Sequence, residues 1–281
     1  MSKQCVVCQD SHNKVIFKEF DIDILKCQSC GHVFSSYQLD QNYDGYFPDQ
    51  IKSEEQYWWN EAHEKIYTDF CNRYLKGKNG RLLDVGCGLG FFVKKISSYS
   101  GWQTVGYEIS PSAVKFARNK LKLKNVYLGK VEQSNLPKNY FDIITLWDVI
   151  EHIPNPHPLI SYLHSVLKKD GLLFIHTPNI LNQLPKARLK KLIKGTKKGV
   201  YYLESKDHVN IYSPQTIKKV LQRNGFNRIE FVHFHPIQSM AGSKNPFSKL
   251  AKNWFFYFTR MVDNLTLGQV NVDNLFVIAK K

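Results

Sequence analysis

The stretch that decides the fold is LLDVGCGLGFF, residues 82–92. A short apolar run ends in Asp84, and glycines follow at Gly86, Gly88 and Gly90. A strand that leads through a glycine turn into a helix binds nucleotide-like cofactors at the carboxyl edge of a parallel sheet. Because glycine has no side chain, a ligand can approach the backbone closely there. The sequence therefore raises the question of which cofactor this turn admits.

The glycine spacing argues against two common cofactors. A dinucleotide fingerprint reads G-x-G-x-x-G, whereas this chain reads G-x-G-x-G with Phe91 in the next position. A phosphate-binding P-loop needs Gly-Lys-Ser/Thr, and the residues from Leu89 to Phe91 supply neither the lysine nor the hydroxyl. Glu108, at the end of the next predicted strand, can accept hydrogen bonds from both hydroxyls of a ribose. A nucleoside without phosphates fits this combination.

Short apolar runs alternate with helical patterns over most of the chain. The predicted strands are residues 81–85, 104–108, 126–128, 143–147, 172–177, 229–234 and 274–279. The predicted helices include residues 60–74, 111–121, 158–167 and 214–224. This alternation predicts an α/β fold in which helices cover both faces of a parallel sheet.

These motifs resemble, in order and spacing, the class I S-adenosylmethionine (SAM) methyltransferases. The resemblance runs from about residue 67 to the C-terminus and includes residues 84–90, Glu108, the pair Phe141-Asp142 and the run KKDGL at 168–172. It implies a Rossmann-like seven-stranded sheet and an enzyme that transfers the methyl group of SAM and releases S-adenosylhomocysteine (SAH). The cofactor-binding residues that it implies are Asp84, Gly86, Cys87, Gly88, Gly90, Glu108, Ile109, Trp147 and Asp148.

Within this resemblance, Asp84 and the glycine turn would hold the amino-acid part of SAM, and Glu108 would hold the ribose. Many relatives place an aspartate after the third strand to receive the adenine amine, but this chain reads LGKVE at residues 128–132. We therefore expect backbone groups to recognise adenine, with Glu132 as a further candidate.

The fourth predicted strand runs into LWDVIEHIPNP, which contains Asp148, Glu151 and His152. On one helical turn, positions i, i+3 and i+4 would face a single point. In the resembled family this strand ends beside the sulfonium of SAM. Methyl transfer is an in-line displacement, so the enzyme must align the acceptor and remove its proton. A histidine titrates near neutral pH, so His152 is the candidate base or orienting group.

Two other roles for these residues stay open. The trio is similar to the Glu-x-x-Glu-His of ubiquinone-pathway O-methyltransferases and small-RNA 2′-O-methyltransferases, which hold a divalent cation such as Mg²⁺ or Mn²⁺. Asp148 is one methylene shorter than the first glutamate of that motif. The resemblance also makes His208 a candidate to join the site, because similar proteins have a histidine at this point before a Ser-Pro helix start. The third role is structural, with Glu151 and His152 bracing the local turn.

Two cysteine pairs predict a structural metal site near the N-terminus. Cys5 and Cys8 form one C-x-x-C pair, and Cys27 and Cys30 form a second pair 18 residues later, followed by Gly31. Two thiolates on each of two turns suit a tetrahedral Zn²⁺. Because four thiolates leave no open coordination position, the predicted site is structural.

The predicted domains are a zinc ribbon at residues 1–36, an aromatic arm and helix at 37–76, and a methyltransferase domain at 77–281. A ribbon joined to a class I domain resembles a bacterial group that includes sugar C-methyltransferases. In that group the arm tends to lie over the active site. The candidate lid residues are Tyr43, Tyr46, Tyr57 and Trp58.

Two further segments carry clues about partners. The insertion at residues 185–207 has seven basic residues and no acid before Glu204, which suits a phosphate-bearing acceptor or an anionic surface. In the resembled fold it would lie over the substrate mouth. The aromatic segment at 246–265 has apolar positions on more than one helical face, so a dimer contact or peripheral membrane contact is expected there.

The formal net charge of +15 suits an anionic partner, and an ordinary solvated surface is the alternative. We expect a cytoplasmic monomer or homodimer that methylates a small-molecule acceptor, such as a sugar, lipid-linked or natural-product intermediate. A metal-assisted RNA 2′-O-methyltransferase and a non-catalytic SAM-binding protein are the alternatives. Acids between the cysteine pairs, including Glu19 and Asp21, argue against nucleic acid.

Overall fold

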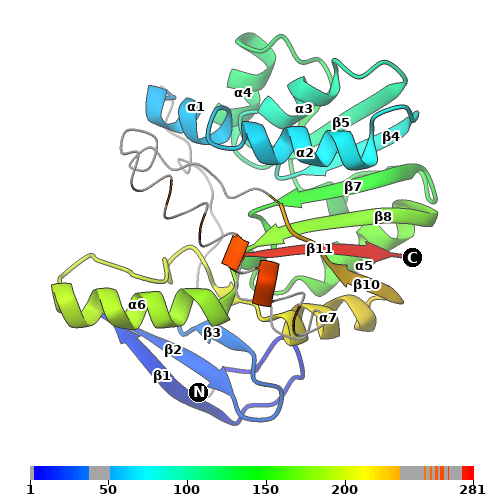
Figure 1. The fold of residues 1–281 in the computed structure, drawn as a ribbon. Helices are drawn as coiled ribbons and strands as arrows, with labels where there is room; N and C mark the ends of the chain where they lie inside the picture. Colours follow the sequence, from blue (N-terminus) through cyan, green and yellow to red (C-terminus); the bar gives the residue numbers. More distant parts are fainter. Residues whose placement is uncertain are drawn as a thin grey trace.

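The structure is a computed structural model that describes residues 3–37, 51–234 and 274–281, together with isolated positions between 250 and 265. Within helix α1 (Ser53–Trp59), the side chains of residues 54, 55 and 57 lie outside this description. The described chain forms a seven-stranded mixed sheet and a separate four-stranded sheet (Figure 1). Among the helices in the described ranges, none is long and apolar enough to span a membrane.

The large sheet has the strand order β10-β11-β8-β7-β4-β5-β6. Its strands are β4 (Gly80–Val85), β5 (Trp102–Glu108), β6 (Val126–Leu128), β7 (Phe141–Trp147), β8 (Leu167–Thr177), β10 (Arg228–Phe231) and β11 (Leu275–Lys280). The first five strands are parallel, and β11 is antiparallel to both β8 and β10. The predicted Rossmann-like seven-stranded sheet is confirmed.

Helices cover both faces of this sheet, as its strand pattern predicts. They are α2 (Glu64–Tyr74), α3 (Phe91–Ile96), α4 (Pro111–Asn119), α5 (His157–Val166) and α7 (Pro214–Arg223), with 3₁₀ turns η1 (Val131–Gln133) and η2 (Ile150–His152). A further helix, α6 (Ile180–Lys194), lies against the four-stranded sheet instead. Two starts are fixed locally. Ser110 caps α4 by accepting a hydrogen bond from Ala113 N, and Ser213 and Thr216 form a capping box at α7.

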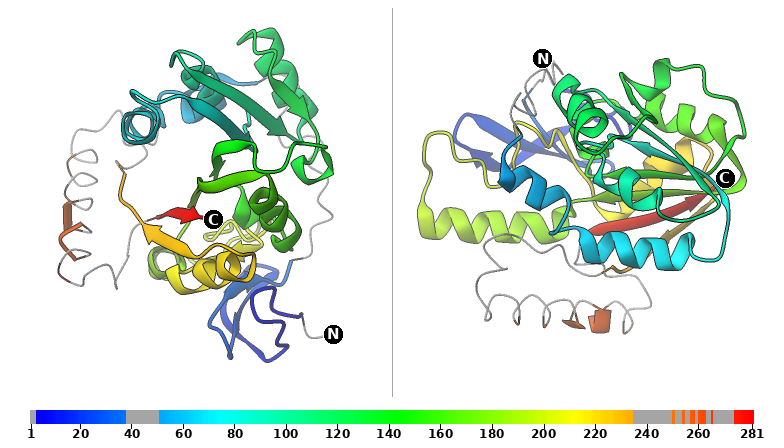
Figure 2. Two further views of the ribbon diagram at one scale, coloured as in Figure 1. Left: turned by 90° about the vertical axis from the view of Figure 1, so that its right-hand side faces the viewer. Right: turned by 90° about the horizontal axis from the view of Figure 1, so that it is seen from above.

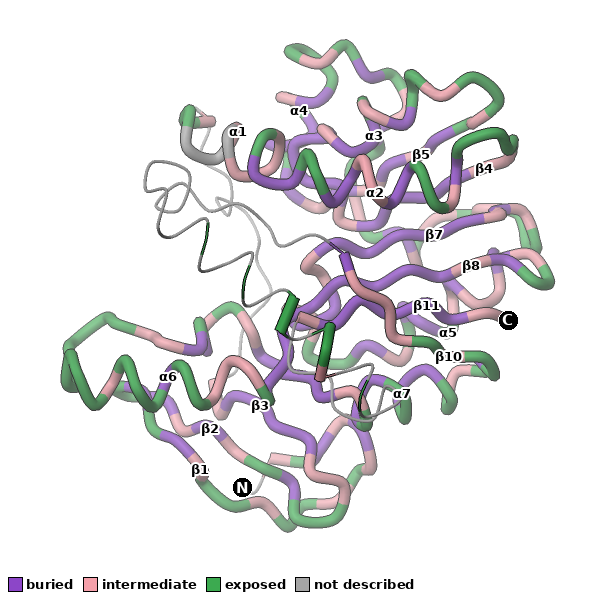
Figure 3. The backbone as a smooth tube through the Cα atoms, in the orientation of Figure 1, coloured by how far each residue is buried: buried purple, intermediate pink, exposed green. Residues whose placement is uncertain are grey.

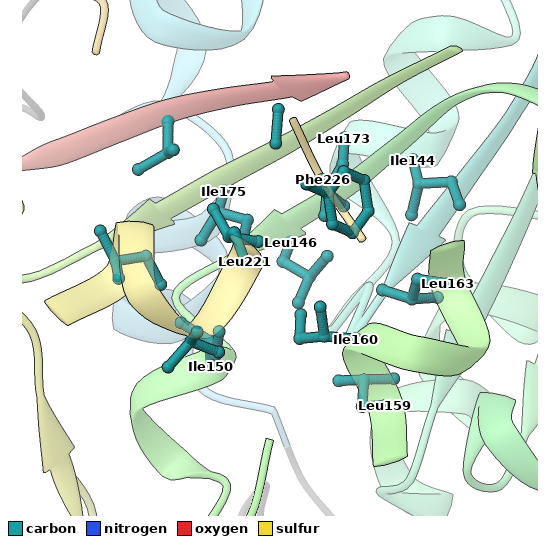
Figure 4. Packing of buried hydrophobic residues seen from close by; sticks show 14 of the residues in the cluster. Ile144, Leu146, Ile150, Leu159, Ile160, Leu163, Leu173, Ile175, Leu221 and Phe226 are labelled. Carbon is teal, nitrogen blue, oxygen red and sulfur yellow. The ribbon is translucent and has the colours of Figure 1, made fainter. Parts of the chain in front are cut away.

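Neighbouring residues of one strand belong to different halves of the core. Leu83 and Ile144 pack in the cluster under α5 and α7, which also contains Leu159, Leu163 and Leu221 (Figure 4). Leu82 and Ile143, one position earlier, pack instead with the aromatic residues of α2 and α3. This alternation follows from the two-residue period of a strand. The central strands are therefore buried on both faces (Figure 3).

The small sheet combines the N-terminal ribbon with a piece of the later chain. Its order is β1-β2-β3-β9, with β1 (Asn13–Glu19), β2 (Ile22–Cys27), β3 (Val33–Ser35) and β9 (Asn210–Ile211). The sheet lies beside α6 and α7, at the end of the molecule opposite α4 (Figure 2). The chain segment that we predicted as the ribbon thus shares its sheet with residues far along the sequence.

The first part of the basic insertion, residues 185–194, belongs to helix α6, which its charge pattern did not reveal. Asn179 caps α6 by accepting a hydrogen bond from Leu181 N, and the buried Ile180 and Ala187 pack against the ribbon sheet. Lys191 donates to the carbonyl of Lys18 at 2.6 Å. One face of α6 therefore covers β1 and β2.

Candidate active site

The glycine turn after β4 is held in a conformation that other residues rarely adopt. Gly86, Gly88 and Gly90 all have positive φ, with values of 68°, 52° and 82°. A Cβ atom added at Gly86 would lie 2.5 Å from Cγ2 of Val149. A side chain at this position would therefore clash with the loop that follows β7, in addition to straining the backbone.

Glu108 holds the turn through its side chain. One carboxylate oxygen accepts a hydrogen bond from Gly88 N at 2.9 Å, and the other accepts one from Ser110 N at 2.8 Å. Burial raises the pKa of Glu108 above its usual value. Each carboxylate oxygen has a second lone pair, so both remain able to accept a ribose hydroxyl.

A pocket with about 900 Å³ of empty space, including its open mouth, lies at the carboxyl edge of the sheet. Predicted site residues that line it are Gly86, Gly88, Glu108, Ile109, Trp147, Asp148 and His152. Gly129, Lys130 and Glu132 also line it, where the sequence predicts adenine recognition.

Three other predicted residues support this pocket from behind. Asp84 is buried and accepts a hydrogen bond from Thr145 Oγ1 at 2.7 Å. Burial, with the nearby Glu108 carboxylate, raises the pKa of Asp84 to about 7. Cys87 is also buried, and Gly90 caps the N-terminus of α3.

Asp148 lies at the end of β7 between two histidines that the sequence analysis missed. Its Oδ1 lies 2.9 Å from Nδ1 of His176, and its Oδ2 lies 3.9 Å from Nε2 of His63. Burial acts to raise the pKa of Asp148, but the two imidazoles outweigh it and hold the pKa well below the usual range. Asp148 is therefore an anion that faces the pocket.

A signal for His176 was present in the sequence. It stands at the carboxyl end of β8, next to the end of β7 that carries Asp148, and register pairs it with Trp147. Parallel strands end at one edge of the sheet, so this position could have been included. His63 comes from the start of α2, and no local pattern connects it with Asp148.

The helical turn expected for Asp148, Glu151 and His152 is not formed. Asp148 has a positive φ of 52°, and the turn after it is the 3₁₀ turn η2. Asp148 therefore points to His63 and His176, away from the other two. Glu151, His152 and His208 instead form a group whose ligand atoms lie within 4.8 Å of one another. His208 thus lies where the sequence analysis expected it, beside His152.

The polar atoms of this group have distinct environments. Nδ1 of His152 lies 3.0 Å from the carbonyl oxygen of Asp207. Burial lowers the pKa of His208 to about 4, and burial together with the neighbouring His208 lowers that of His152 to about 4. Burial raises the pKa of Glu151 well above its usual value, with Asp148 adding to the effect. Glu151 accepts a hydrogen bond from Thr177, and within the described chain its Oε1 has no partner.

The four N-terminal cysteines converge. The Sγ atoms of Cys5 and Cys30 are 3.5 Å apart, those of Cys8 and Cys27 are 3.4 Å apart, and all four lie within 4.8 Å of one another. A tetrahedral Zn²⁺ with Zn–S distances of about 2.3 Å separates its sulfurs by about 3.8 Å. None of the six cysteines forms a disulfide bond. The donor set and its spacing fit zinc.

The candidate lid residues are only partly described. Tyr43, Tyr46 and the side chain of Tyr57 lie outside the described residues. The Trp58 carbonyl is 2.5 Å from Nδ1 of His63, and the Trp58 ring packs edge-on against the same imidazole. Trp59, which the sequence analysis did not include, lines the pocket and stacks on the other side of His63.

The basic insertion and the aromatic segment are the two regions that the sequence suggests as partner-binding regions. On α6, Leu189, Leu192 and Ile193 are exposed on the face away from the ribbon. Most of residues 246–265 lie outside the described chain, although the rings of Trp254 and Phe258 are seen stacked 5.6 Å apart.

Known proteins match the chain over this region. A family described as a methyltransferase domain matches residues 58–230. The ubiquinone biosynthesis O-methyltransferase of Glaesserella parasuis is 28% identical over 174 residues, which cover 56% of this chain and 70% of the relative. The protein of the same name from Coxiella burnetii is 26% identical over 201 residues, covering 65% and 82%.

Solved structures share the fold. Haemonchus contortus phosphoethanolamine N-methyltransferase 2, bound to phosphomonomethylethanolamine and SAH, matches with a TM-score of 0.58 and 19% identity over 86% of this chain and 59% of that chain. A Pyrococcus horikoshii protein matches with a TM-score of 0.55 and 18% identity over 87% and 100%. The family match spans more than half of the chain and includes the glycine turn, Glu108 and Asp148. The chain therefore belongs to the methyltransferase-domain family and is a SAM-dependent methyltransferase.

Proposed function

We propose that this enzyme transfers the methyl group of SAM to an oxygen or carbon atom of a small-molecule acceptor, with His152 as the base. Sugars, lipid-linked molecules and natural-product intermediates are the acceptor classes. Relatives named O-methyltransferase favour a hydroxyl acceptor. The acceptor loses its proton to His152, its oxygen bonds to the methyl carbon, and the carbon–sulfur bond breaks to leave neutral SAH.

The observation that carries this proposal is the contact between His152 and the carbonyl of Asp207. A carbonyl oxygen only accepts hydrogen bonds, so Nδ1 of the neutral imidazole must hold the proton. Nε2 then has the lone pair that a base needs. Because burial lowers the pKa of His152 to about 4, this ring is neutral at pH 7 and Nε2 carries no proton. The Asp148 anion favours the imidazolium that forms.

A metal-assisted reaction is the second candidate, favoured by the donor set of Glu151, His152 and His208. Two neutral imidazoles and a carboxylate within 4.8 Å form a metal-ligand combination, and a bound cation would lower the raised pKa of Glu151. The buried Oε1 of Glu151, which has no partner among the described residues, would gain one. Bound Mg²⁺ or Mn²⁺ would orient and acidify an acceptor hydroxyl.

We further propose that Cys5, Cys8, Cys27 and Cys30 hold a structural Zn²⁺. The short Sγ separations and the two matching turns support this assignment. Gln9 N donates to the Cys5 carbonyl at 2.7 Å, and Gly31 N donates to the Cys27 carbonyl at 3.0 Å. Gln9 and Gly31, each next to the second cysteine of its pair, both have positive φ. Metal analysis of the purified protein should give one zinc per chain.

The test of the proposed function is transfer of labelled methyl from SAM into fractionated host extract. His152→Ala should reduce incorporation about 100-fold or more, while His12→Ala, a change at an exposed ribbon histidine, should leave it unchanged. Methyl transfer at the wild-type rate in His152→Ala would show that His152 is not the base.

The same assay separates the two candidates for the site. Activity that survives a chelator while the ribbon zinc is retained favours His152 as base. Loss that Mg²⁺ or Mn²⁺ restores favours the metal. Label that enters RNA, with steeply salt-dependent binding of bulk RNA, would contradict a small-molecule acceptor.

A further inference from the structure

The ribbon is built into the loop that carries His208. Strand β3 pairs with β9, with Val33 opposite Ile211 and Phe34 opposite Asn210. Ser35 extends this contact, since its backbone N donates to the Val209 carbonyl at 3.0 Å and its buried hydroxyl donates to the Ser205 carbonyl at 2.7 Å. Residues 205–211 are therefore held by β3, whose first residue follows Cys30 by only three positions.

A buried side-chain relay continues from the ribbon to the turn that carries His152. Nδ2 of Asn210 lies 2.7 Å from the carbonyl of Ile153 and 3.3 Å from that of Pro154. Carbonyls only accept hydrogen bonds, so the amide nitrogen must face them and Oδ1 must face His32. His32 Nε2, at 2.9 Å, is then the donor. His32 is itself fully buried and lies between the rings of Phe34 and Tyr212.

This relay joins the backbone segment that carries His152 to the one that carries His208. We call these two segments the acceptor side of the site. Ile153 directly follows His152 in the chain, and Asn210 follows His208 by two residues. The two segments also meet where His152 contacts the Asp207 carbonyl. A shift of either segment would change the separation of His152 and His208, whose ring centroids are 4.9 Å apart.

We propose that the ribbon positions the acceptor side of the active site, with His32 and Asn210 as positioning residues. This inference rests on the proposed role of His152. The ribbon thus affects the reaction indirectly, through His32 and Asn210. Its cysteines hold the turn that presents His32, and His32 orients the amide that ties the two catalytic segments together.

A second contact of the ribbon provides the control. Arg223 donates to the Val7 carbonyl, and His157 Nε2 lies 2.9 Å from the Val6 carbonyl. These contacts attach the first cysteine turn to α5 and α7, and they touch neither His152 nor His208. Arg223→Ala therefore weakens the docking of the ribbon without removing the relay.

The test uses zinc-loaded full-length protein with ¹³C-labelled histidine. The ring resonances of His152 and His208 are assigned from His152→Ala and His208→Ala and then followed in four variants. His32→Phe keeps an aromatic ring but removes the donor, and Asn210→Leu removes the amide. His32→Gln restores a donor at similar reach, and Arg223→Ala is the control.

We expect His32→Phe and Asn210→Leu to shift or broaden both ring signals and to lower methyl transfer about 10- to 100-fold, since small misplacements at a reacting centre have effects of this size. His32→Gln should recover most of the loss, and Arg223→Ala should change the rate less than twofold. Zinc content and SAM affinity should stay at wild-type values in all four. Native ring signals in both His32→Phe and Asn210→Leu would overturn the inference.

Two further results keep the test decisive. If His32→Phe does not fold, Asn210→Leu and Asn210→Ala replace it, because they alter no residue of the ribbon segment 1–36. If His152→Ala keeps wild-type activity, the proposed base is wrong, but the ring signals still report whether the ribbon fixes this site. Equal losses in Arg223→Ala and Asn210→Leu would mean that general docking, rather than the relay, is responsible, which also contradicts the inference.

Discussion

The cofactor side and the acceptor side of this active site are held together in different ways. On the cofactor side, Glu108 bonds the backbone of Gly88, 20 residues away, and of Ser110, two residues away. On the acceptor side, His32 reaches Asn210 across 178 residues, and Asn210 reaches Ile153 across 57. One side is closed by short loops and backbone donors, and the other by side chains from distant segments.

This difference predicts unequal sensitivity. Short loops are closed at a smaller entropic cost than long ones. Contacts between distant segments exist only while the whole tertiary arrangement is intact. Damage to the ribbon should therefore affect acceptor chemistry and leave SAM binding largely unchanged.

The largest effect should come from breaking the cofactor side itself. Glu108→Ala removes the acceptor of two buried backbone donors and of the expected ribose hydroxyls, so SAM affinity should fall about 100-fold or more. Titration calorimetry checks this. Glu132→Ala, which changes another acidic residue that lines the pocket, should lower SAM affinity much less. SAM binding within threefold of wild type in Glu108→Ala would refute the assignment.

The next effect should come from the ribbon. In Cys27→Ser we expect loss of zinc, a lower melting temperature and methyl transfer reduced about tenfold or more, with SAM affinity changed less than about threefold. Cys71→Ser changes a buried cysteine outside the metal cluster and should keep the zinc. If SAM affinity falls as far as methyl transfer does in Cys27→Ser, the two sides are not independent.

A smaller effect should appear where the two sides meet, at Asp148. His176→Phe keeps the stacking on Phe276 but removes an imidazole that holds the pKa of Asp148 low. We expect SAM, a sulfonium cation, to bind about 3- to 10-fold more weakly, while neutral SAH binds almost as before. His164→Phe, on α5, is the matched control. Equal losses for SAM and SAH would show that Asp148 does not face the sulfonium.

The smallest effect is an opposite pH dependence of the two sides. Folding lowers the pKa of His152 and His208 to about 4, so the unfolded chain binds more protons and stability falls as pH drops from about 6.5 towards 4. Folding raises the pKa of Asp84 to about 7, so its contribution is present at low pH and is lost as pH rises through about 7.

Denaturant unfolding at several pH values separates these two contributions. His152→Leu should reduce the loss of stability between pH 6.5 and 4, and Asp84→Asn should make that loss steeper. Identical pH profiles for both variants and wild type would contradict the assigned protonation states.

The same contrast explains how much the sequence could predict. The glycine turn, Glu108 and the positions of the strands follow from patterns that lie within a few tens of residues, and they are close to where the sequence predicts them. The cysteine pairs could also be predicted from the sequence, because each pair lies on one local turn. His208 was also included, from its position before the start of α7.

The acceptor side was harder to predict from the sequence because its contacts are made by distant segments. Spacing of i, i+3 and i+4 predicted one helical turn for Asp148, Glu151 and His152. The positive φ of Asp148 and the 3₁₀ turn η2 instead direct the Asp148 side chain away from the other two. His63 and Asn210 had no local pattern of their own, and His176 could be inferred only from its place at the carboxyl end of β8. Strand β9, two residues long, is too short to show a period.

That short strand also affects how the chain is made. Strand β3 emerges from the ribosome early, yet its hydrogen-bonding partner Asn210–Ile211 and the helix that covers the ribbon's apolar face follow more than 140 residues later. During synthesis the edge of β3 therefore stays unpaired, and Ile22 and Ile24 stay exposed, until these later segments have been made. Early capture of metal by the four thiolates would keep this nascent segment ordered until its late partner arrives.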